Sequence, residues 1–335
     1  MDVVKRGKGE LFTSPDPDVA REFFRAKNKA LVAKVMTVQE AVRRFVHDGD
    51  YLAIGGFGAN RIPTAVCHEI VRQKRRGMGF LGHTSTHDFQ ILAAGEVFDR
   101  CDVAYVVGLE ARGLSPNARR YMESGKVRVT ENSNYGLSLR LKAAAMGLPF
   151  LPARHLMGTD TFEKSPASIV TCPYTARKLV LQPAVYPDVA AIHVHEADVF
   201  GNCRIRGIHI SDLDLARASR RLIITCERLV HSDEIRSDPT RTLIPYYLVD
   251  AVCEVRYGGY PGCMAHEYFS DEEHLRKWLE VERDPEAFAA FLQANIYGVS
   301  DFWEYLERNG GMRKLTRLRR MELRIRAREE DHGQA

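Results

Sequence analysis

The sequence predicts an α/β fold in which an open, mainly parallel sheet is covered by helices on both faces. Three observations support this prediction. Apolar segments of strand length alternate with helical segments along most of the chain, and glycine-containing polar stretches separate many of them. The strand segments are apolar enough to be buried on both faces. The 335 residues are 45% hydrophobic and 27% charged, an ordinary globular composition without a clear linker or internal repeat. We therefore expect one α/β domain of roughly 290 residues.

The first element of this domain is a helix with a recognisable start. In KVMTVQEAVRRFV, Thr37 and Glu40 form a capping box. One face of the following helix carries the apolar residues Val38, Ala41, Val42, Phe45 and Val46. Asp48 and Gly49 end it, and YLAIGGF then predicts a buried strand over 51–57.

Helices and strands continue to alternate after this strand. Helices are predicted over 64–76, 88–98, 117–125 and 135–147. Strands are predicted over 78–85, 101–110, 126–132, 178–185, 189–198, 221–230 and 249–255. The chain thus divides into a polar N-terminal extension (1–33) with a short helix near 18–33, the main domain (34–312) and a basic C-terminal tail (313–335).

Composition argues against several classes of partner. The 48 basic and 44 acidic residues leave a formal charge of +4, too small to indicate nucleic-acid binding. No apolar run approaches the ~20 residues of a membrane helix, and the N-terminus has no apolar signal core. The seven cysteines are odd in number and lack CxxC spacing, so we expect reduced thiols in a cytoplasmic protein. We expect no metal and no membrane or nucleic-acid partner.

Three polar stretches each follow a predicted strand and precede a helix. They are residues 55–63, the HTSTHD stretch (83–88) and the TENSNYG stretch (130–136). Active groups in such folds gather at the carboxyl ends of the strands, so we expect these stretches to meet at one edge.

The glycine turn within DGDYLAIGGFGANRIP (48–63) has two interpretations. Its backbone N–H groups could bind an anion or stabilise an oxyanion, and Arg61 could add a contact to a carboxylate or phosphate. Alternatively, it is a tight strand–helix connection that needs positive φ. The pattern matches neither GxGxxG nor GxxxxGK[ST], so nucleotide-binding fingerprints are absent.

The same stretch resembles the α-subunit signature of class I coenzyme A transferases. The common signature has Gly where this chain has Arg61, and NRIP resembles the glutaconate CoA-transferase branch. Segments that share the resemblance are KVMTVQEAVRRFVHDGD, HEIVRQ, MGLPFLPARHLMGTD, IITCERLVHSDEIRSDPTRTLIPYYLVDAV and DFWEYLERNGG. The resemblance covers roughly residues 34–312.

The resemblance implies a NagB/RpiA/CoA-transferase-like fold and a covalent mechanism. A glutamate attacks an acyl-CoA thioester to give an acyl-glutamyl anhydride and CoA thiolate, then a glutamyl-CoA thioester, and a second acid takes over the CoA. That glutamate lies in a Ser-Glu-Asn-Gly motif of the β half, which this chain lacks. The resemblance therefore implies an α-type subunit of a hetero-oligomer, completed by a β-type partner, with coenzyme A thioester as substrate and no permanently bound cofactor.

Candidate site residues follow from the three stretches. Substrate or CoA contacts are predicted at Gly55, Gly56, Phe57, Gly58, Arg61, His83, Ser85, Asn132 and Ser133. Glu131 and Glu110 are auxiliary catalytic candidates, although Glu131 could simply favour a helix dipole and Glu110 could be a loop carboxylate.

Other patterns favour structural roles. HVHE (193–196) offers His-x-His but no third metal ligand is evident, and HTSTHD lacks the GxSxG elbow of a hydrolase. Gly201 and Asn202 suit a tight turn. In the basic tail, Leu315, Leu318 and Ile325 could form an apolar seam.

Three functions remain open at this point. The first is the α-type half of a CoA-transferase that acts on a short-chain or dicarboxylic acid. The second is a family relative that decarboxylates an acyl-CoA or hydrolyses a CoA-linked ring. The third is a non-catalytic binding protein.

Overall fold

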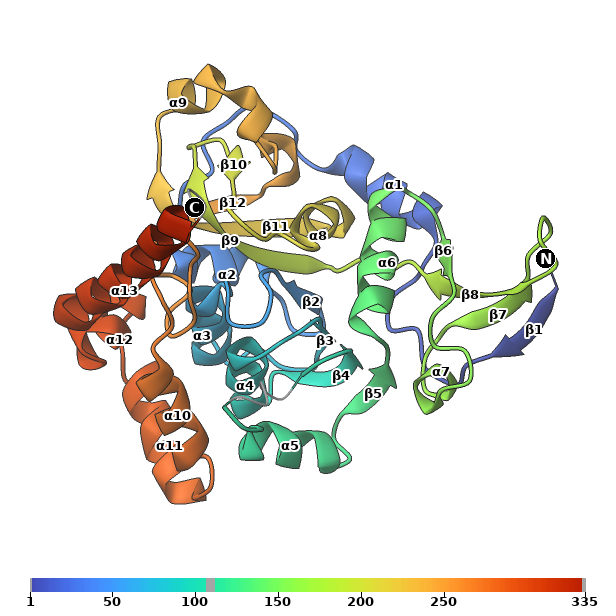
Figure 1. Ribbon diagram of the computed structural model, residues 1–335, viewed down its shortest axis with the longest axis horizontal. Coiled ribbons are helices and arrows are strands. Elements are labelled where there is room, and N and C mark those ends of the chain that lie inside the picture. The colour runs from blue at the N-terminus through green and yellow to red at the C-terminus, as the bar shows by residue number, and fades with distance from the viewer. Residues whose placement is uncertain (1, 107–111, 333–335) are drawn as a thin grey trace.

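The computed structural model describes residues 2–106 and 112–332, which form one large and one small sheet (Figure 1). The large sheet has the order β12 (Ala251–Glu254), β11 (Arg221–Leu229), β9 (Val189–Ala197), β2 (Tyr51–Ile54), β3 (Met78–Gly82), β4 (Phe98–Val103), β5 (Arg128–Glu131). Neighbours along this path are parallel, and among the described strands of this sheet the short β10 (Cys203–Arg204) alone pairs antiparallel, with β9. The predicted, mainly parallel sheet is confirmed.

Strand order reverses between β2 and β9. From β2 the sheet extends through β3, β4 and β5 in one direction, and from β9 it extends through β11 and β12 in the other. In open α/β sheets, ligands bind outside the carboxyl ends of the strands at such a switch point. The glycine turn follows β2 directly, so the fold places it beside this point.

Helices cover both faces of the large sheet, as the sequence predicts. Successive strand residues alternate between faces, so Leu52 joins one hydrophobic core and Ala53 the other. The first core also takes residues from α2 (Val38–Phe45), α3 (Thr64–Arg72), α4 (His87–Ala94) and α5 (Pro116–Glu123). The second takes residues from α1 (Pro17–Ala26), α6 (Asn134–Ala145) and α8 (Asp212–Ala218).

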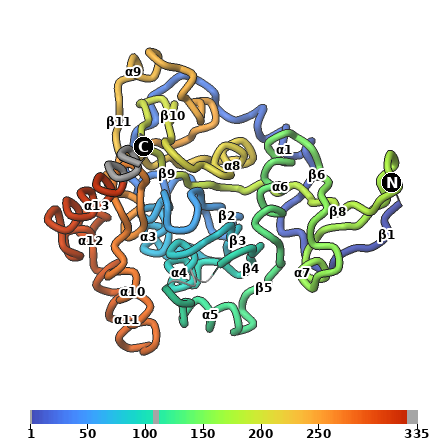
Figure 2. Tube along the Cα trace, viewed as in Figure 1, coloured from blue at the N-terminus to red at the C-terminus, as the bar shows by residue number. Residues whose placement is uncertain are grey.

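The C-terminal region extends the first core. It contains α10 (Glu272–Val281), α11 (Pro285–Leu292), the π turn η3 (Gln293–Tyr297), α12 (Phe302–Arg308) and α13 (Gly311–His332). Figure 2 shows these helices beside α3 and α4, at the opposite end of the molecule from β1. Leu315 and Leu318 of α13 are buried in the core, whereas Ile325 is 42% exposed. The first turns of the predicted tail are therefore part of the packed domain.

The small sheet is antiparallel and was not predicted. Its order is β1 (Val3–Arg6), β7 (Ser168–Thr171), β8 (Lys178–Pro183), β6 (Phe150–Ala153). The strand predicted over 178–185 lies here rather than in the parallel sheet. The N-terminal extension contributes β1, and Gly7 N donates to Ala167 O at 2.9 Å. The extension is thus packed against residues more than 150 positions further along the chain.

Short helices complete the chain, and some element ends differ from the predictions. The short helices are α7 (Asp160–Glu163), α9 (Ser232–Ser237), η1 (Pro239–Arg241) and η2 (Tyr246–Leu248). The helix predicted over 88–98 ends at Ala94, because Glu96 takes a φ of 48° and Phe98 already begins β4. Among residues 2–106 and 112–332, no helix has both the length and the apolarity needed to span a membrane.

Candidate functional site at the carboxyl edge of the sheet

The three predicted stretches meet at the carboxyl edge of the large sheet. Gly58 N donates to Thr84 O at 3.0 Å, which joins the glycine turn to the stretch after β3. His83 Nε2 lies 3.1 Å from Asn134 O, which joins that stretch to the one after β5. This convergence was inferred from topology alone and is confirmed.

The backbone N–H groups of the glycine turn are already used within the chain. The amides of residues 55 to 58 donate, in order, to Ala191 O (2.8 Å), Asp212 Oδ1 (2.9 Å), Asn60 O (3.0 Å) and Thr84 O (3.0 Å). Gly56 and Gly58 have φ values of 87° and 61°, which favour glycine. These features support the tight-turn interpretation. The four amides do not form an open anion cradle in this conformation.

Arg61 is buried, whereas the predicted contact with a substrate carboxylate or phosphate would need it free at the edge. Its side chain is inaccessible to solvent, and Nη2 lies 2.7 Å from Asp212 Oδ2, whose side chain is 2% exposed. Nη2 also donates to Ile208 O, and Nη1 lies 3.4 Å from His193 O. Its charge is therefore compensated inside the protein, so direct pairing with a substrate carboxylate would require the Asp212 contact to break.

His83 is a neutral hydrogen-bonding group beside this turn. Its Nε2 contacts both Asn134 O and Ser138 Oγ at 3.1 Å. A carbonyl oxygen only accepts, so Nε2 carries a proton. Burial lowers the pKa of His83, which favours the neutral imidazole with Nδ1 as an acceptor. His83 therefore cannot act through Nε2 as a base toward Ser138, but Nδ1 can accept a hydrogen bond from a ligand.

Several predicted contact residues are engaged in local structure. Ser85 is buried and its hydroxyl contacts the Asp88 carboxylate, whose pKa burial raises to about 6. Asn132 donates to Gln182 Oε1 at 3.1 Å, and Ser133 Oγ caps α6 by accepting from Gly136 N at 3.0 Å. These contacts position the edge, and ligand binding by these side chains stays a prediction.

The two predicted auxiliary carboxylates are Glu131 and Glu110. Glu131 ends β5 and forms an ion pair with Lys164 at 2.8 Å, with 32% of its side chain exposed. Its neighbour therefore comes from the connection between β6 and β7 of the small sheet. Glu110 lies outside the described residues.

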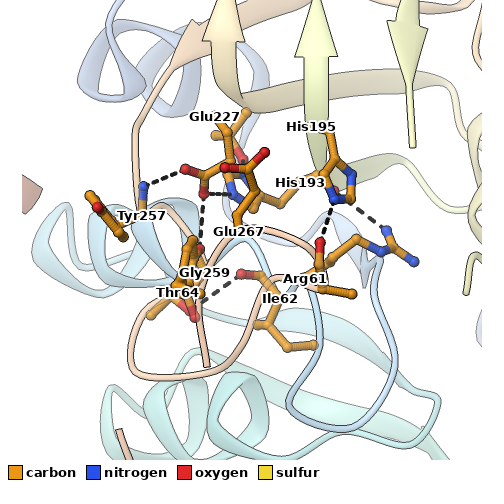
Figure 3. A network of polar contacts seen from close by, with 12 residues as sticks. Arg61, Ile62, Thr64, His193, His195, Glu227, Tyr257, Gly259 and Glu267 are labelled. Atoms are coloured by element: carbon orange, nitrogen blue, oxygen red, sulfur yellow. Dashed lines mark hydrogen bonds and ion pairs between the residues drawn. The ribbon is translucent and has the colours of Figure 1, made fainter. Parts of the chain in front are cut away.

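A buried polar network underlies the glycine turn and was missed in the sequence (Figure 3). On β9, His193 contacts Thr225 Oγ1 through Nδ1 and Glu227 Oε1 through Nε2, each at 2.8 Å. Glu227 also accepts from Tyr268 Oη and from Tyr257 N. The network reaches Arg61 through the His193 carbonyl oxygen. The sequence does contain polar residues in both strands, HVHE (193–196) and TCE (225–227). Their pairing could not be predicted, because one sequence does not show the register between two strands.

The same contacts explain the His-x-His pattern without a metal. Both ring nitrogens of His193 are engaged, and those of His195 contact Ala265 O at 2.8 Å and Arg206 N at 3.0 Å. Burial lowers the pKa of His195 to about 3. Within residues 2–106 and 112–332, no three His, Cys, Asp or Glu side chains are grouped to hold a metal ion.

A cavity of about 300 Å³ lies elsewhere, between α2, α3, β12 and α12. Val38, Glu69, Phe302 and Trp303 contribute to its lining, and none of the predicted site residues does. The polar stretches at the carboxyl edge therefore do not enclose this cavity.

Comparison with known proteins adds direct information about ancestry. The family model described as "Coenzyme A transferase" matches residues 35–255. The A-type subunit of glutaconate CoA-transferase from Acidaminococcus fermentans is 32% identical over 299 residues, which span 84% of this chain and 93% of that protein. An uncharacterized protein from Archaeoglobus fulgidus is 48% identical over 96% of this chain and 72% of its own length.

Two solved structures of related proteins superpose on this chain. The crystal structure of glutaconate coenzyme A-transferase from Acidaminococcus fermentans superposes with a TM-score of 0.79 at 31% identity, covering 85% of this chain and 94% of that one. A variant of the decarboxylase AibA/AibB superposes with a TM-score of 0.71 at 31% identity, covering 79% and 98%. The fold is thus shared by proteins with different named reactions.

Proposed function

Because the chain belongs to the coenzyme A transferase family, we propose that it is the A-type subunit of a two-subunit enzyme that moves CoA from an acyl-CoA to a free carboxylic acid. The observation that carries this proposal is the match to the A-type subunit of glutaconate CoA-transferase over 84% of the chain. Acyl-CoA and a small acid are the substrates, and we expect the enzyme in the cytoplasm.

A separate B-type subunit supplies the nucleophile in this proposal. The chain lacks the Ser-Glu-Asn-Gly motif that carries the attacking glutamate in the family it resembles. The loops after β4 and β10 and the first turn of α6 expose large apolar side chains: Leu114 (54%), Tyr135 (59%), Ile208 (60%) and Ile210 (50%). Exposed apolar side chains at a functional edge are typical of an interface, so Tyr135, which belongs to the TENSNYG stretch, and Ile208, whose carbonyl oxygen accepts from Arg61, support a partner covering this edge.

The chain's own residues contribute shape and neutral hydrogen bonding to the reaction. The glycine turn brings backbone to the carboxyl edge without side chains in the way. His83 offers Nδ1 as an acceptor to the substrate or to CoA. The partner's glutamate attacks the acyl-CoA to form the anhydride and release CoA thiolate, and the thiolate then attacks the glutamyl carbonyl, which gives glutamyl-CoA and releases the first acid as a carboxylate. The second acid displaces CoA thiolate to form a new anhydride, and thiolate attack on its acyl carbonyl gives the new acyl-CoA and frees the glutamate.

A second candidate function is decarboxylation of an acyl-CoA. It is favoured by the structural similarity to AibA/AibB, at nearly the same identity as to the transferase. The two candidates differ in the partner rather than in this chain. A Ser-Glu-Asn-Gly-like glutamate in the partner supports transfer, and its replacement supports decarboxylation.

The test is to purify this chain alone and together with the B-type protein encoded beside it. CoA exchange is then assayed between acyl-CoAs and free monocarboxylic and dicarboxylic acids, with loss of carbon dioxide followed in parallel. We expect exchange from the pair and none from this chain. Exchange by the chain alone would contradict the proposal and make Glu131 and Glu110 the first candidates for a nucleophile.

A further inference from the structure

We propose that Ser211 and Asp212, consecutive residues at the start of α8, are positioning residues that align the glycine turn and His83 for the transfer reaction. The inference rests on the proposed location of the site at the carboxyl edge. Neither residue belongs to the three polar stretches, and neither was predicted from the sequence.

Asp212 holds the glycine turn through two separate contacts. Its Oδ1 accepts the Gly56 N–H at 2.9 Å, and its Oδ2 pairs with Arg61 at 2.7 Å. The carboxylate thus binds the turn near its start and at its end. A Cβ atom at Gly55 would lie 2.7 Å from Asp212 Oδ1, so glycine at that position leaves room for the carboxylate. Glycine is therefore required at the two positions for different reasons: at Gly55 it leaves room for the Asp212 carboxylate, and at Gly56 it allows a φ of 87°.

Ser211 is linked to His83 by a directional chain of hydrogen bonds. Because His83 Nε2 carries a proton, Ser138 Oγ can only accept at this contact, and it shares that one proton with Asn134 O. Ser138 Oγ lies 3.0 Å from Ser211 Oγ, and its own proton is free to be donated there. Ser211 is 9% exposed, so this link is shielded from bulk water. The order His83, Ser138, Ser211 favours the imidazole orientation in which Nδ1 is the available acceptor.

The Ser211 and Asp212 side chains bind neighbouring segments instead of capping α8, which supports a positioning role. Ser and Asp at a helix start commonly accept hydrogen bonds from the amides of the first turn. Ser211 is the residue preceding the first turn of α8, yet its side chain makes no capping hydrogen bond. Asp212 directs both carboxylate oxygens to the glycine turn. Both side chains thus serve the edge of the sheet, and α8 connects the turn after β2 with the stretch after β3.

Ser219 provides a matched control at the other end of the same helix. It is fully buried, and its hydroxyl donates to Leu215 O at 2.7 Å. Ser219→Ala removes one buried hydrogen bond from α8 without touching the turn or His83. A purely structural role for Ser211 would make the two alanine variants equivalent in catalysis.

The experiment compares Ser211→Ala, Ser211→Thr, Asp212→Asn and Ser219→Ala in the assembled two-subunit enzyme. We expect Ser211→Ala and Asp212→Asn to lower kcat at least tenfold with KM within threefold, because alignment for the transition state is lost rather than ground-state binding. Ser211→Thr keeps the hydroxyl and should recover most of the rate. Ser219→Ala should keep kcat within twofold. Equal kcat values for Ser211→Ala and Ser219→Ala would overturn the role of Ser211.

A second measurement keeps the inference testable without transfer activity. Hydrogen–deuterium exchange of a peptide covering residues 51–61 should speed up in Asp212→Asn and stay unchanged in Ser219→Ala. Unchanged protection of the turn in folded Asp212→Asn would overturn the role of Asp212. If Asp212→Asn does not fold, the positioning role of the start of α8 is judged from Ser211→Ala and Ser211→Thr. Loss of kcat in the first with recovery in the second supports it, and unchanged kcat in Ser211→Ala overturns it. Absence of exchange by the wild-type pair would count against the proposed function, whereas the deuterium result would still judge the positioning contacts.

Discussion

Arg61 and Asp212, 151 positions apart in the sequence, form an ion pair of 2.7 Å in which neither side chain reaches solvent appreciably. The pair joins the turn after β2 to the start of α8, across the point where strand order reverses. A buried pair of this kind contributes little net stability compared with apolar residues, but loss of one partner leaves an uncompensated charge.

We expect Arg61→Ala to destabilise the protein strongly, by about 3–5 kcal/mol in the free energy of unfolding, because Asp212 would be left buried without its counter-ion. Urea unfolding followed by circular dichroism measures this change. Arg119→Ala is the control, since the Arg119–Glu123 pair is 63% exposed on both sides and should contribute at most about 0.5 kcal/mol. Similar small losses in both variants would show that the Arg61 pair is not buried in solution. The double variant Arg61→Met, Asp212→Asn should lose less free energy of unfolding than the sum of the losses measured for Arg61→Met and Asp212→Asn separately.

Gly56→Ala should disrupt the turn and abolish activity of the assembled enzyme. The added Cβ would lie 2.6 Å from Asn60 O and 2.7 Å from Arg61 O, both backbone atoms, in addition to the strain of a φ of 87°. Gly49 offers a matched control, because its φ is 83° but no atom lies within 4 Å of an added Cβ. Gly49→Ala should cost only about 1–2 kcal/mol. Thermal unfolding and CoA exchange separate the two, and equal behaviour would contradict the clash.

Stability should fall in mild acid because of buried neutral histidines. Burial lowers the pKa of His68 to about 3 from the ordinary 6.5, and its Nε2 has no hydrogen-bond partner within the described residues. Between these pH values the unfolded chain binds a proton that the folded chain does not, so the free energy of unfolding decreases as pH falls from 6.5 toward 3. The slope is about 1.4 kcal/mol per pH unit for each such histidine.

His68→Phe tests this prediction, since His68 already packs against the rings of Phe302 and Tyr305. Unfolding free energies of both proteins are measured at pH 8 and pH 5. The difference at pH 8 reports packing alone, and we expect the variant to lose less stability on going to pH 5. An identical loss in both proteins would mean that His68 titrates normally in the folded state.

Glu131→Gln should retain CoA exchange within threefold in the assembled enzyme. The Glu131 carboxylate is partly exposed and already engaged by Lys164 at 2.8 Å, which suits an edge ion pair better than a reacting group. Steady-state kinetics with Lys164→Gln as the companion variant tests this, because an ion-pair role predicts similar small effects from both. A hundredfold loss confined to Glu131→Gln would restore its catalytic assignment.

The sequence was most informative where one segment determines its own structure. Central strands of the parallel sheet such as β2 and β9 are short, buried, mostly apolar runs, and the helix start at Thr37 is local: Thr37 Oγ1 accepts from Glu40 N at 3.1 Å. The small sheet was not predicted, because β1 is exposed along its whole length and has no strand-like apolar pattern. Its pairing with β7 depends on residues that are distant in the chain.

The candidate site was only partly predictable for the same reason. The edge that holds the glycine turn and His83 followed from topology, as did their proximity. The burial of Arg61 did not, because it depends on Asp212 and on the main-chain oxygens of Ile208 and His193. A motif shows which residue types are present, but the partner that neutralises a charge is contributed by another part of the fold.

The position of β9 inside the sheet has a consequence for synthesis of the chain on the ribosome. Tyr51 N at the start of β2 donates to Asp188 Oδ2, a residue made 137 positions later. At 5–20 residues per second, translation leaves that edge of β2 without its neighbour for roughly 7–27 s. An unpaired strand edge is a template for association with other chains. Chaperone protection of the N-terminal half of the nascent protein therefore matters most during this period. The period ends when β9 emerges and pairs with β2.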